Sequence, residues 1–193
     1  MPPKVKIDKE SILEAAVDIL REQGENSLHA REIAKRLGCS IQPIFSNYEN
    51  MADLKEKVKK RGEEIYNGYM QQGMETHRIP FLGMGMGYIL FAKEEKNLFR
   101  LLFMSNELQG NELRGLVQGE DNQQILSLIS GMTGLSLDSS ENLFLSIWLI
   151  THGMAAMVAT NDLELGEEEV EMILMNAFTG IRDQLGKGDK RDE

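Results

Sequence analysis

The chain has 193 residues, of which 41% are hydrophobic and 27% are charged, and this composition is ordinary for a soluble globular protein. Its apolar runs are short and interrupted and its first residues lack an apolar signal core, so we expect a cytoplasmic protein that does not enter a membrane. The single cysteine, Cys39, excludes an internal disulfide, and no Cys or His spacing suits zinc, so we also expect no metal and no cofactor.

The charge is distributed unevenly along the chain. Residues 1–61 contain 12 Lys and Arg against 10 Asp and Glu, a balance of +2, whereas residues 62–193 contain 9 against 21, a balance of -12. A slightly basic head on an acidic body is typical of a protein whose head contacts an anion. A plain acidic protein has the same overall composition, so this asymmetry alone leaves both interpretations open.

Apolar residues recur at spacings of three and four along most of the chain, and no hairpin signal separates them, so the sequence predicts an all-α fold of about nine helices. The first four helices are expected over 9–22, 27–37, 41–48 and 50–73. Ser27 is the predicted N-cap of the second helix, and Gly24 and Gly38 are expected to end the first and the second.

The remaining helices are expected over 80–96, 97–108, 123–135, 139–160 and 167–185. The segment 106–122 is polar and contains glycine, which predicts a loop or a frayed helix. A short turn at 161–166 predicts that the last two helices pack as an antiparallel hairpin.

The sequence gives no sign of an enzyme. It lacks a nucleophile paired with His and an acid, and it lacks a glycine-rich phosphate loop that follows a strand. The stretch GMGMG at 83–87 lies in an apolar helical context, which indicates a bend or a point of close packing. We therefore expect a binding protein and not a catalyst.

Pro43 lies where the third helix would begin. In a helix interior a proline costs about 3 kcal/mol, but with Ser40 as the N-cap it falls in the first turn, where the amide has no intrahelical acceptor. The result is a short helix that follows the second one after a break at Gly38. This arrangement favours a helix-turn-helix, in which the N-terminal end of the second helix meets the major groove of DNA.

Three segments of the first 60 residues resemble the N-terminal domain of the TetR family of bacterial transcriptional regulators. They are the apolar positions from Ile12 to Gly24, REIAKRLGCS at 31–40 and IFSNYENMADL at 44–54. Further along, Trp148-x-x-x-His152-Gly153 resembles a variant of the C-terminal domain of that family. The resemblance implies a helix-turn-helix DNA-binding domain over residues 1–50 and a larger ligand-binding and dimerisation domain over residues 51–193.

The function implied by this resemblance is a ligand-responsive transcriptional regulator, a repressor that binds a palindromic DNA operator as a homodimer and is released by a small apolar or amphipathic effector. Met51 stands where the family usually has a phosphate-binding lysine, and Phe45 stands at a tyrosine position of the family. A second interpretation is therefore a small-molecule-binding helical protein with the same fold that no longer binds DNA.

DNA contacts are expected from the third helix and from nearby basic residues. Gln42 can form two hydrogen bonds with adenine. The alternative is that Gln42 is a solvent-exposed polar residue that binds nothing. Ile44 is expected to pack inward, and Phe45 is left open between the core and the DNA backbone. The expected contact residues are Lys4, Lys6, Ser40, Gln42, Pro43, Phe45, Ser46, Asn47, Tyr48 and Lys55.

An effector pocket is expected among aromatic residues of the second domain, and the twelve methionines of the chain suit a loosely specified apolar ligand. For each aromatic residue taken alone, a place in the packed core is the simpler interpretation. The expected pocket residues are Tyr88, Phe91, Phe99, Phe103, Met104, Phe144, Trp148 and His152.

The dimer is expected to form through the last two helices. The helix over 167–185 carries an apolar stripe that is almost free of charge, and a second copy related by a two-fold axis would cover it in a four-helix interface. The expected interface residues are Val170, Leu174, Ala177, Phe178 and Ile181.

Overall fold

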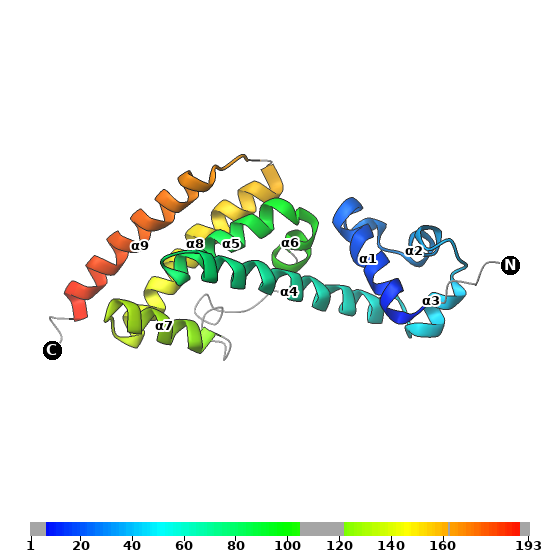
Figure 1. Cartoon of the computed structure of the whole chain (residues 1–193), viewed down its shortest axis with the longest axis horizontal. Helices are drawn as coiled ribbons and strands as arrows, with labels where there is room; N and C mark the ends of the chain where they lie inside the picture. The colour runs from blue at the N-terminus through cyan, green and yellow to red at the C-terminus, as the bar shows by residue number, and fades with distance from the viewer. Residues whose placement is uncertain (1–6, 105–121, 162, 190–193) are drawn as a thin grey trace. The chain divides into compact units, whose positions relative to one another are not determined.

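The computed structural model describes residues 7–104, 122–161 and 163–189 (Figure 1). These residues form α-helices, one 3-10 turn at Glu25–Ser27 and no strand, which confirms the predicted all-α fold of about nine helices. In the described residues the helices are α1 (Lys9–Gln23), α2 (Ala30–Arg36), α3 (Gln42–Asn47), α4 (Met51–Thr76), α5 (Pro80–Glu94), α6 (Lys96–Phe103), α7 (Gln123–Thr133), α8 (Leu137–Asn161) and α9 (Glu167–Asp189).

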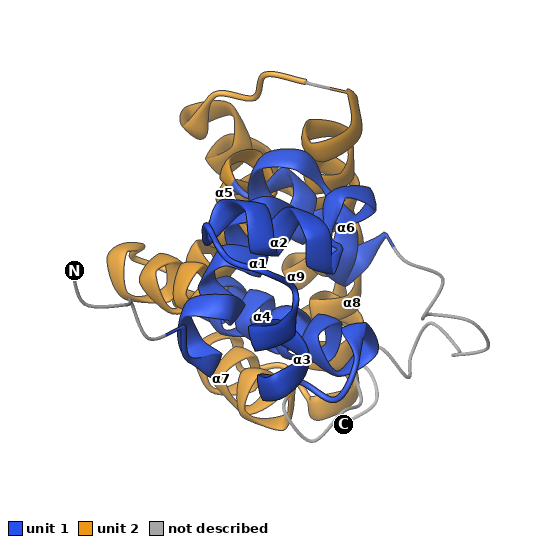
Figure 2. Ribbon diagram, turned by 90° about the vertical axis from the view of Figure 1, so that its right-hand side faces the viewer, with its two compact units in different colours: residues 1–67, 95–105 blue, residues 68–94, 106–193 orange. Residues whose placement is uncertain are grey.

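The chain forms two compact units (Figure 2). Unit 1 comprises residues 1–67 and 95–105, and unit 2 comprises residues 68–94 and 106–193. The expected boundary between residues 50 and 51 coincides with the start of α4, whereas the observed division lies within α4 and assigns α6 to unit 1. Packing of Leu98 from α6 against Gly62 of α4 explains why α6 belongs to unit 1.

The helices of unit 1 begin at defined capping groups. The Asp8 carboxylate accepts a hydrogen bond from the Ser11 amide at 2.9 Å, and the Ser11 hydroxyl accepts one from the Asp8 amide at 3.1 Å, which together cap α1. The N-cap prediction for Ser27 is wrong, because residues 25–27 form the 3-10 turn and α2 begins later. Its N-cap is His29, whose Nδ1 accepts from the Glu32 amide at 3.4 Å.

A charged pair ties α1 to the start of α6 in unit 1. The Arg21 guanidinium donates through Nε to Glu95 at 2.7 Å and through Nη2 to the other carboxylate oxygen. Glu95 is only 5% exposed, so its charge needs this partner. The Asn97 amide also donates to the Arg21 carbonyl oxygen at 2.9 Å. These contacts fix the register of α6 on α1.

In unit 2, α4 and α5 approach each other closely at glycines. A Cβ atom on Gly73 would lie 2.1 Å from the Gly83 carbonyl oxygen, and a Cβ atom on Gly87 would lie 2.3 Å from the Tyr69 carbonyl oxygen. Only glycine allows two helix backbones to come this near. The GMGMG stretch is therefore a point of close packing, one of the two possibilities predicted for it.

The core of unit 2 surrounds α8, which packs on α5, α7 and α9. In Figure 1, α8 and α9 run side by side in opposite directions, as expected for an antiparallel hairpin. Among the described residues, α8 is also the one helix long and apolar enough by length and composition to cross a membrane. It contains the whole of the helix predicted over 139–160, and burial of residues such as Leu143 and Ile147 inside unit 2 accounts for its apolar composition.

Candidate functional site

The exposed face of α3 carries polar and apolar side chains together. Ile41 and Phe45 are 45% and 46% exposed, and Gln42 and Ser46 are exposed beside them, because residues four apart lie one above the other on a helix. The Ser46 hydroxyl donates to the Gln42 carbonyl oxygen at 2.9 Å, whereas the Gln42 side chain forms no hydrogen bond with the described residues. This face can provide amide hydrogen bonds to base edges and apolar contacts to thymine methyl groups.

The opposite side of α3 is packed into unit 1. Ile44 is fully buried, as predicted, and Phe45 lies on the exposed side. Tyr48 is 2% exposed, its hydroxyl donates to the Lys9 carbonyl oxygen at 2.9 Å, and burial raises its pKa. The Lys9 ammonium lies 4.9 Å from the Tyr48 ring centre. Including Tyr48 among the DNA contacts was therefore wrong, since its hydroxyl is occupied and cannot reach a phosphate.

The start of α3 differs by one residue from the prediction. Ile41 is the N-cap residue and already has helical dihedral angles, so Ser40 is exposed but does not cap the helix. Pro43 lies in the first turn, as predicted, where its missing amide removes no hydrogen bond. The Asn47 side-chain amide donates to the Pro43 carbonyl oxygen at 2.8 Å, and this bond occupies a group that was expected to contact DNA.

Many basic side chains of unit 1 are paired with acidic neighbours. The Lys55 ammonium lies 3.1 Å from Glu25, so a phosphate at Lys55 would have to compete with a carboxylate. Arg36 donates to both oxygens of Glu22 at 2.7 Å, and this contact holds the pKa of Glu22 below its usual value. Arg61 contacts three further carboxylates. Lys4 and Lys6 lie outside the described residues.

The residues expected to line one effector pocket are divided between the two units. Phe99, Phe103 and Met104 belong to unit 1, where Phe103 meets the ring of Tyr66 edge-on at 5.1 Å. The other expected residues belong to unit 2 and are Tyr88, Phe91, Phe144, Trp148 and His152. No pocket within one unit therefore contains all eight residues, and a single pocket built from them stays a prediction.

The aromatic residues of unit 2 are mostly packed in its core. Phe91 is fully buried and Phe144 is 5% exposed, with its ring 5.8 Å from that of Phe81. The space left beside Tyr88, Phe144 and Trp148 is about 20 Å³. A void of that size holds about one water molecule. An effector could enter there only after side chains had moved.

His152 lies on α8 between two aromatic side chains. Its ring stacks on Trp148, with ring centres 5.0 Å apart and planes 12° apart, and its Nδ1 lies 2.9 Å from the Tyr88 hydroxyl oxygen. Burial lowers the pKa of His152 below its ordinary value of 6.5, so the imidazole is neutral near neutral pH. Within the described ranges, no three His, Cys, Asp or Glu side chains are placed to hold a metal.

We expect His152 to make folding stability depend on pH. In the unfolded chain it takes up a proton near its ordinary pKa of about 6.5, whereas in the folded protein it stays neutral to lower pH. The unfolded state therefore binds more protons below about pH 6.5, and the free energy of unfolding falls as the pH decreases through that range. Replacing His152 with glutamine should weaken this dependence.

Urea denaturation of the wild type and of His152→Gln at about pH 7.5 and about pH 5.5 measures the effect. The loss of stability between the two pH values should be smaller in the variant. An equal loss in both proteins would show that His152 does not contribute to it.

Three of the five residues expected at the dimer interface are buried inside unit 2 itself. Val170, Leu174 and Phe178 face α5 and α8 of the same chain, and the Phe178 ring lies 6.2 Å from that of Phe81. Their assignment to an interface between copies was wrong, because the apolar stripe of α9 is already covered within one chain. The other two, Ala177 and Ile181, are half-buried.

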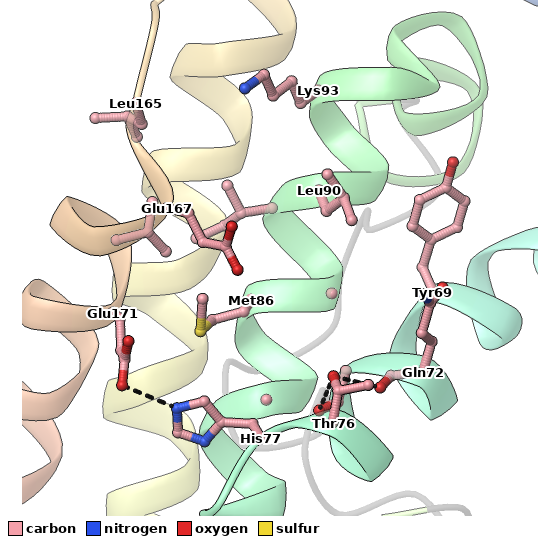
Figure 3. Close-up of a pocket in the computed structure, with 15 residues that line it drawn as sticks. Tyr69, Gln72, Thr76, His77, Met86, Leu90, Lys93, Leu165, Glu167 and Glu171 are labelled. Atoms are coloured by element: carbon pink, nitrogen blue, oxygen red, sulfur yellow. Dashed lines mark hydrogen bonds and ion pairs between the residues drawn. The ribbon is translucent and has the colours of Figure 1, made fainter.

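A groove of about 390 Å³ in unit 2 was not predicted (Figure 3). Its lining residues come from the C-terminal part of α4, from α5 and from the beginning of α9. The sequence contained two signs of it, the glycines at 83 and 87 and the acidic residues of 167–171, but nothing in the sequence placed these segments side by side.

The described residues thus offer two candidate binding surfaces on an all-α fold, the exposed face of α3 in unit 1 and the groove in unit 2. A comparison of the chain with known protein families finds no match, and a search of the curated proteins finds no similar sequence.

Proposed function

We propose that the protein is a ligand-responsive transcriptional regulator of the TetR type. In this proposal it is a cytoplasmic repressor, binds a near-palindromic operator as a homodimer, and releases the operator when a small effector binds unit 2. The helix α3 is the recognition helix, and the segment at 37–41 is the turn that separates it from α2.

The exposed face of α3 is the observation that carries this proposal. Ile41 and Phe45 are large apolar side chains that a partner surface would remove from water. Gln42 lies between them, and its amide can bond adenine through two hydrogen bonds. A helix of this length reaches only a few base pairs, so useful affinity requires two copies of α3 on one duplex.

The dimer proposed here uses the outward stripe of α8. Leu149 and Met157 are 43% and 49% exposed, and Gly153 lies between them with open space where its side chain would be. On α9, Met172 is also exposed. In a dimer with two-fold symmetry, this apolar stripe would pack against the same stripe of the second copy. Each chain would then bury apolar side chains that are exposed to water in the single chain.

The effector acts in this proposal through α4, which contributes residues to both units. The groove in unit 2 is lined by Tyr69, Gln72 and Thr76 from the C-terminal part of α4. A ligand lodged against this part of α4 would favour one position of the helix over another. It would lower operator affinity only if it binds the released state better than the DNA-bound state.

The ion pairs of unit 1 favour a second candidate function, a ligand-binding protein of the same fold that does not bind DNA. Arg36, Arg61 and Lys55 each pair with carboxylates of the same unit, and Met51 stands where a phosphate-binding lysine was expected. Selection of duplexes from a random-sequence pool distinguishes the two functions. Enrichment of a near-palindromic sequence supports the regulator, and no enrichment supports the ligand-binding protein.

Gln42→Ala is expected to relax sequence preference. Loss of a bidentate contact to one base removes about 1–3 kcal/mol of discrimination against other bases at that position. Fluorescence anisotropy with the selected duplex and with its single-base variants measures this change. The overall affinity for unrelated duplexes should stay the same, since contacts to phosphates are not altered.

Gln23→Ala is the matched control, because Gln23 is an exposed glutamine at the end of α1 in the same unit. It should leave both affinity and sequence preference unchanged. If Gln42→Ala keeps the full sequence preference of the wild type, α3 is not the recognition helix.

A further inference from the structure

The groove of unit 2 has three sides (Figure 3). The middle is formed by α5, the last turns of α4 lie on one side, and the first turns of α9 lie on the other. His77 lies toward one end of the groove and Lys93 toward the other. With about 390 Å³ of space, the groove is large enough for a small organic molecule.

The middle of the groove is apolar. Gly83 and Gly87 line the groove where α5 meets the backbone of α4. Met86 and Leu90 of α5 and Leu165 before α9 provide the apolar surface around it. A ligand with an apolar body would release water from this surface on binding, and the flexible thioether of Met86 can adjust to its shape.

The α9 side of the groove is acidic. Glu167 and Glu171 are four residues apart, so both carboxylates lie on the same face of α9, and both line the groove. The Glu167 carboxylate forms no hydrogen bond or ion pair with the described residues. Glu171 Oε1 lies 3.3 Å from His77 Nε2, while His77 Nδ1 lies 3.0 Å from the Ile79 amide nitrogen and 2.9 Å from the Ile79 carbonyl oxygen.

The charge of the lining favours a cation. The described lining includes two carboxylates, Glu167 and Glu171, and one ammonium group, that of Lys93, which lies near the end of the groove away from His77. Residues 62–193 also carry 21 acidic against 9 basic side chains, so the surrounding field attracts cations and repels anions. An anionic ligand would have to lie beside two carboxylates with one lysine to offset them.

We propose that this groove binds an amphipathic organic cation, an amine whose ammonium group lies between Glu167 and Glu171 and whose apolar body covers Met86 and Leu90. Charge-assisted hydrogen bonds from the ammonium group to the two carboxylates orient the ligand, and the apolar contacts add affinity. The role of this amine as the effector of a regulator rests on the function proposed above. Its binding to the groove does not depend on that function.

Isothermal titration calorimetry of the full chain with 4-phenylbutylamine and with 4-phenylbutanoate tests the charge preference, because the two probes share one apolar body and carry opposite charges. The amine is expected to bind, and the carboxylate is expected to bind at least about tenfold more weakly. Glu167→Gln and Glu171→Gln should each weaken amine binding by about tenfold, since each removes one charge from the ammonium site.

Two control variants locate the site. Lys93→Gln removes the one lysine of the lining and should leave amine affinity unchanged or raise it. Leu90→Trp places a larger side chain at a residue that is 41% exposed and should reduce binding of the amine by filling the groove. Circular dichroism and urea denaturation establish that each variant is folded.

The proposal is overturned if the carboxylate binds as well as the amine, if no binding of the amine is detected at millimolar concentration, or if both glutamine variants bind the amine like the wild type. Duplex selection without ligand tests the DNA function separately. Glutamate-dependent amine binding in a protein that selects no duplex would leave the groove site standing and overturn the regulator. Duplex binding without amine binding would support the DNA function and overturn the groove site.

Discussion

Gly73→Ala is expected to destabilise the protein by about 3 kcal/mol or more, enough to unfold unit 2 at a much lower urea concentration. The added Cβ atom would lie 2.1 Å from the Gly83 carbonyl oxygen and 2.8 Å from its carbonyl carbon. These are backbone atoms of α5, so no side-chain rotation can relieve the overlap. The two helices would have to separate, and the apolar contacts between them would be lost.

Gly68→Ala is the matched control for this substitution. Both glycines lie in α4, but a Cβ atom on Gly68 meets no heavy atom within 4 Å. Alanine is favoured over glycine in a helix, so this variant should be more stable than the wild type by about 0.4–1 kcal/mol. Urea denaturation followed by circular dichroism measures both effects. Equal stability of the two variants would mean that α4 and α5 are not in backbone contact.

Leu149→Glu and Met157→Glu are each expected to convert the proposed dimer into a folded monomer. Both side chains lie on the outward stripe of α8, where a carboxylate is harmless in the monomer but would face its own copy across a two-fold axis. A monomer has one α3 and not two, so affinity for a two-site operator should fall by about a hundredfold or more. Size-exclusion chromatography with light scattering and anisotropy on the same samples measure both changes.

Two further variants distinguish loss of the dimer from the effect of an added charge elsewhere on the surface and from unfolding. Leu137 is 63% exposed in the first turn of α8, off the stripe of Leu149 and Met157, so Leu137→Glu should stay dimeric. Phe178→Glu should unfold the protein, because Phe178 is 3% exposed and packs within unit 2. A monomeric wild type at micromolar concentration, or dimers in both stripe variants, would rule out the interface.

The sequence alone predicted which segments are helical, because helix formation depends on spacing, capping and breaking residues that are close in the chain. The predicted helix over 167–185 is observed as α9 (Glu167–Asp189), and Pro43 lies in the first turn of a short helix. Ile44 is buried, as predicted. Errors at this level were local, such as the start of α2 at Ala30 and not at Ser27.

The sequence could not decide what covers an apolar surface. The stripe of α9 with Leu174 and Phe178 has the pattern of an interface between copies, but it equally suits burial within one chain, and the structure packs it on α5 and α8. The aromatic residues gave the same ambiguity, since Phe91 and Phe99 are each fully buried and belong to different units. A hydrophobic pattern shows that a side chain is removed from water but not which partner removes it.

Only the tertiary structure decided where the groove of unit 2 lies. Glu171, His77 and Leu90 are distant in sequence, and they share one groove because α9 and the end of α4 both border α5. The sequence around Gly83 suggested either a bend or a packing point. The structure shows a packing point, because the backbone of α4 at Gly73 lies against the backbone of α5 at Gly83. Local sequence determined the helices of this protein, whereas its cavity and its exposed stripe depend on which helices meet, a property of contacts between residues far apart in the chain.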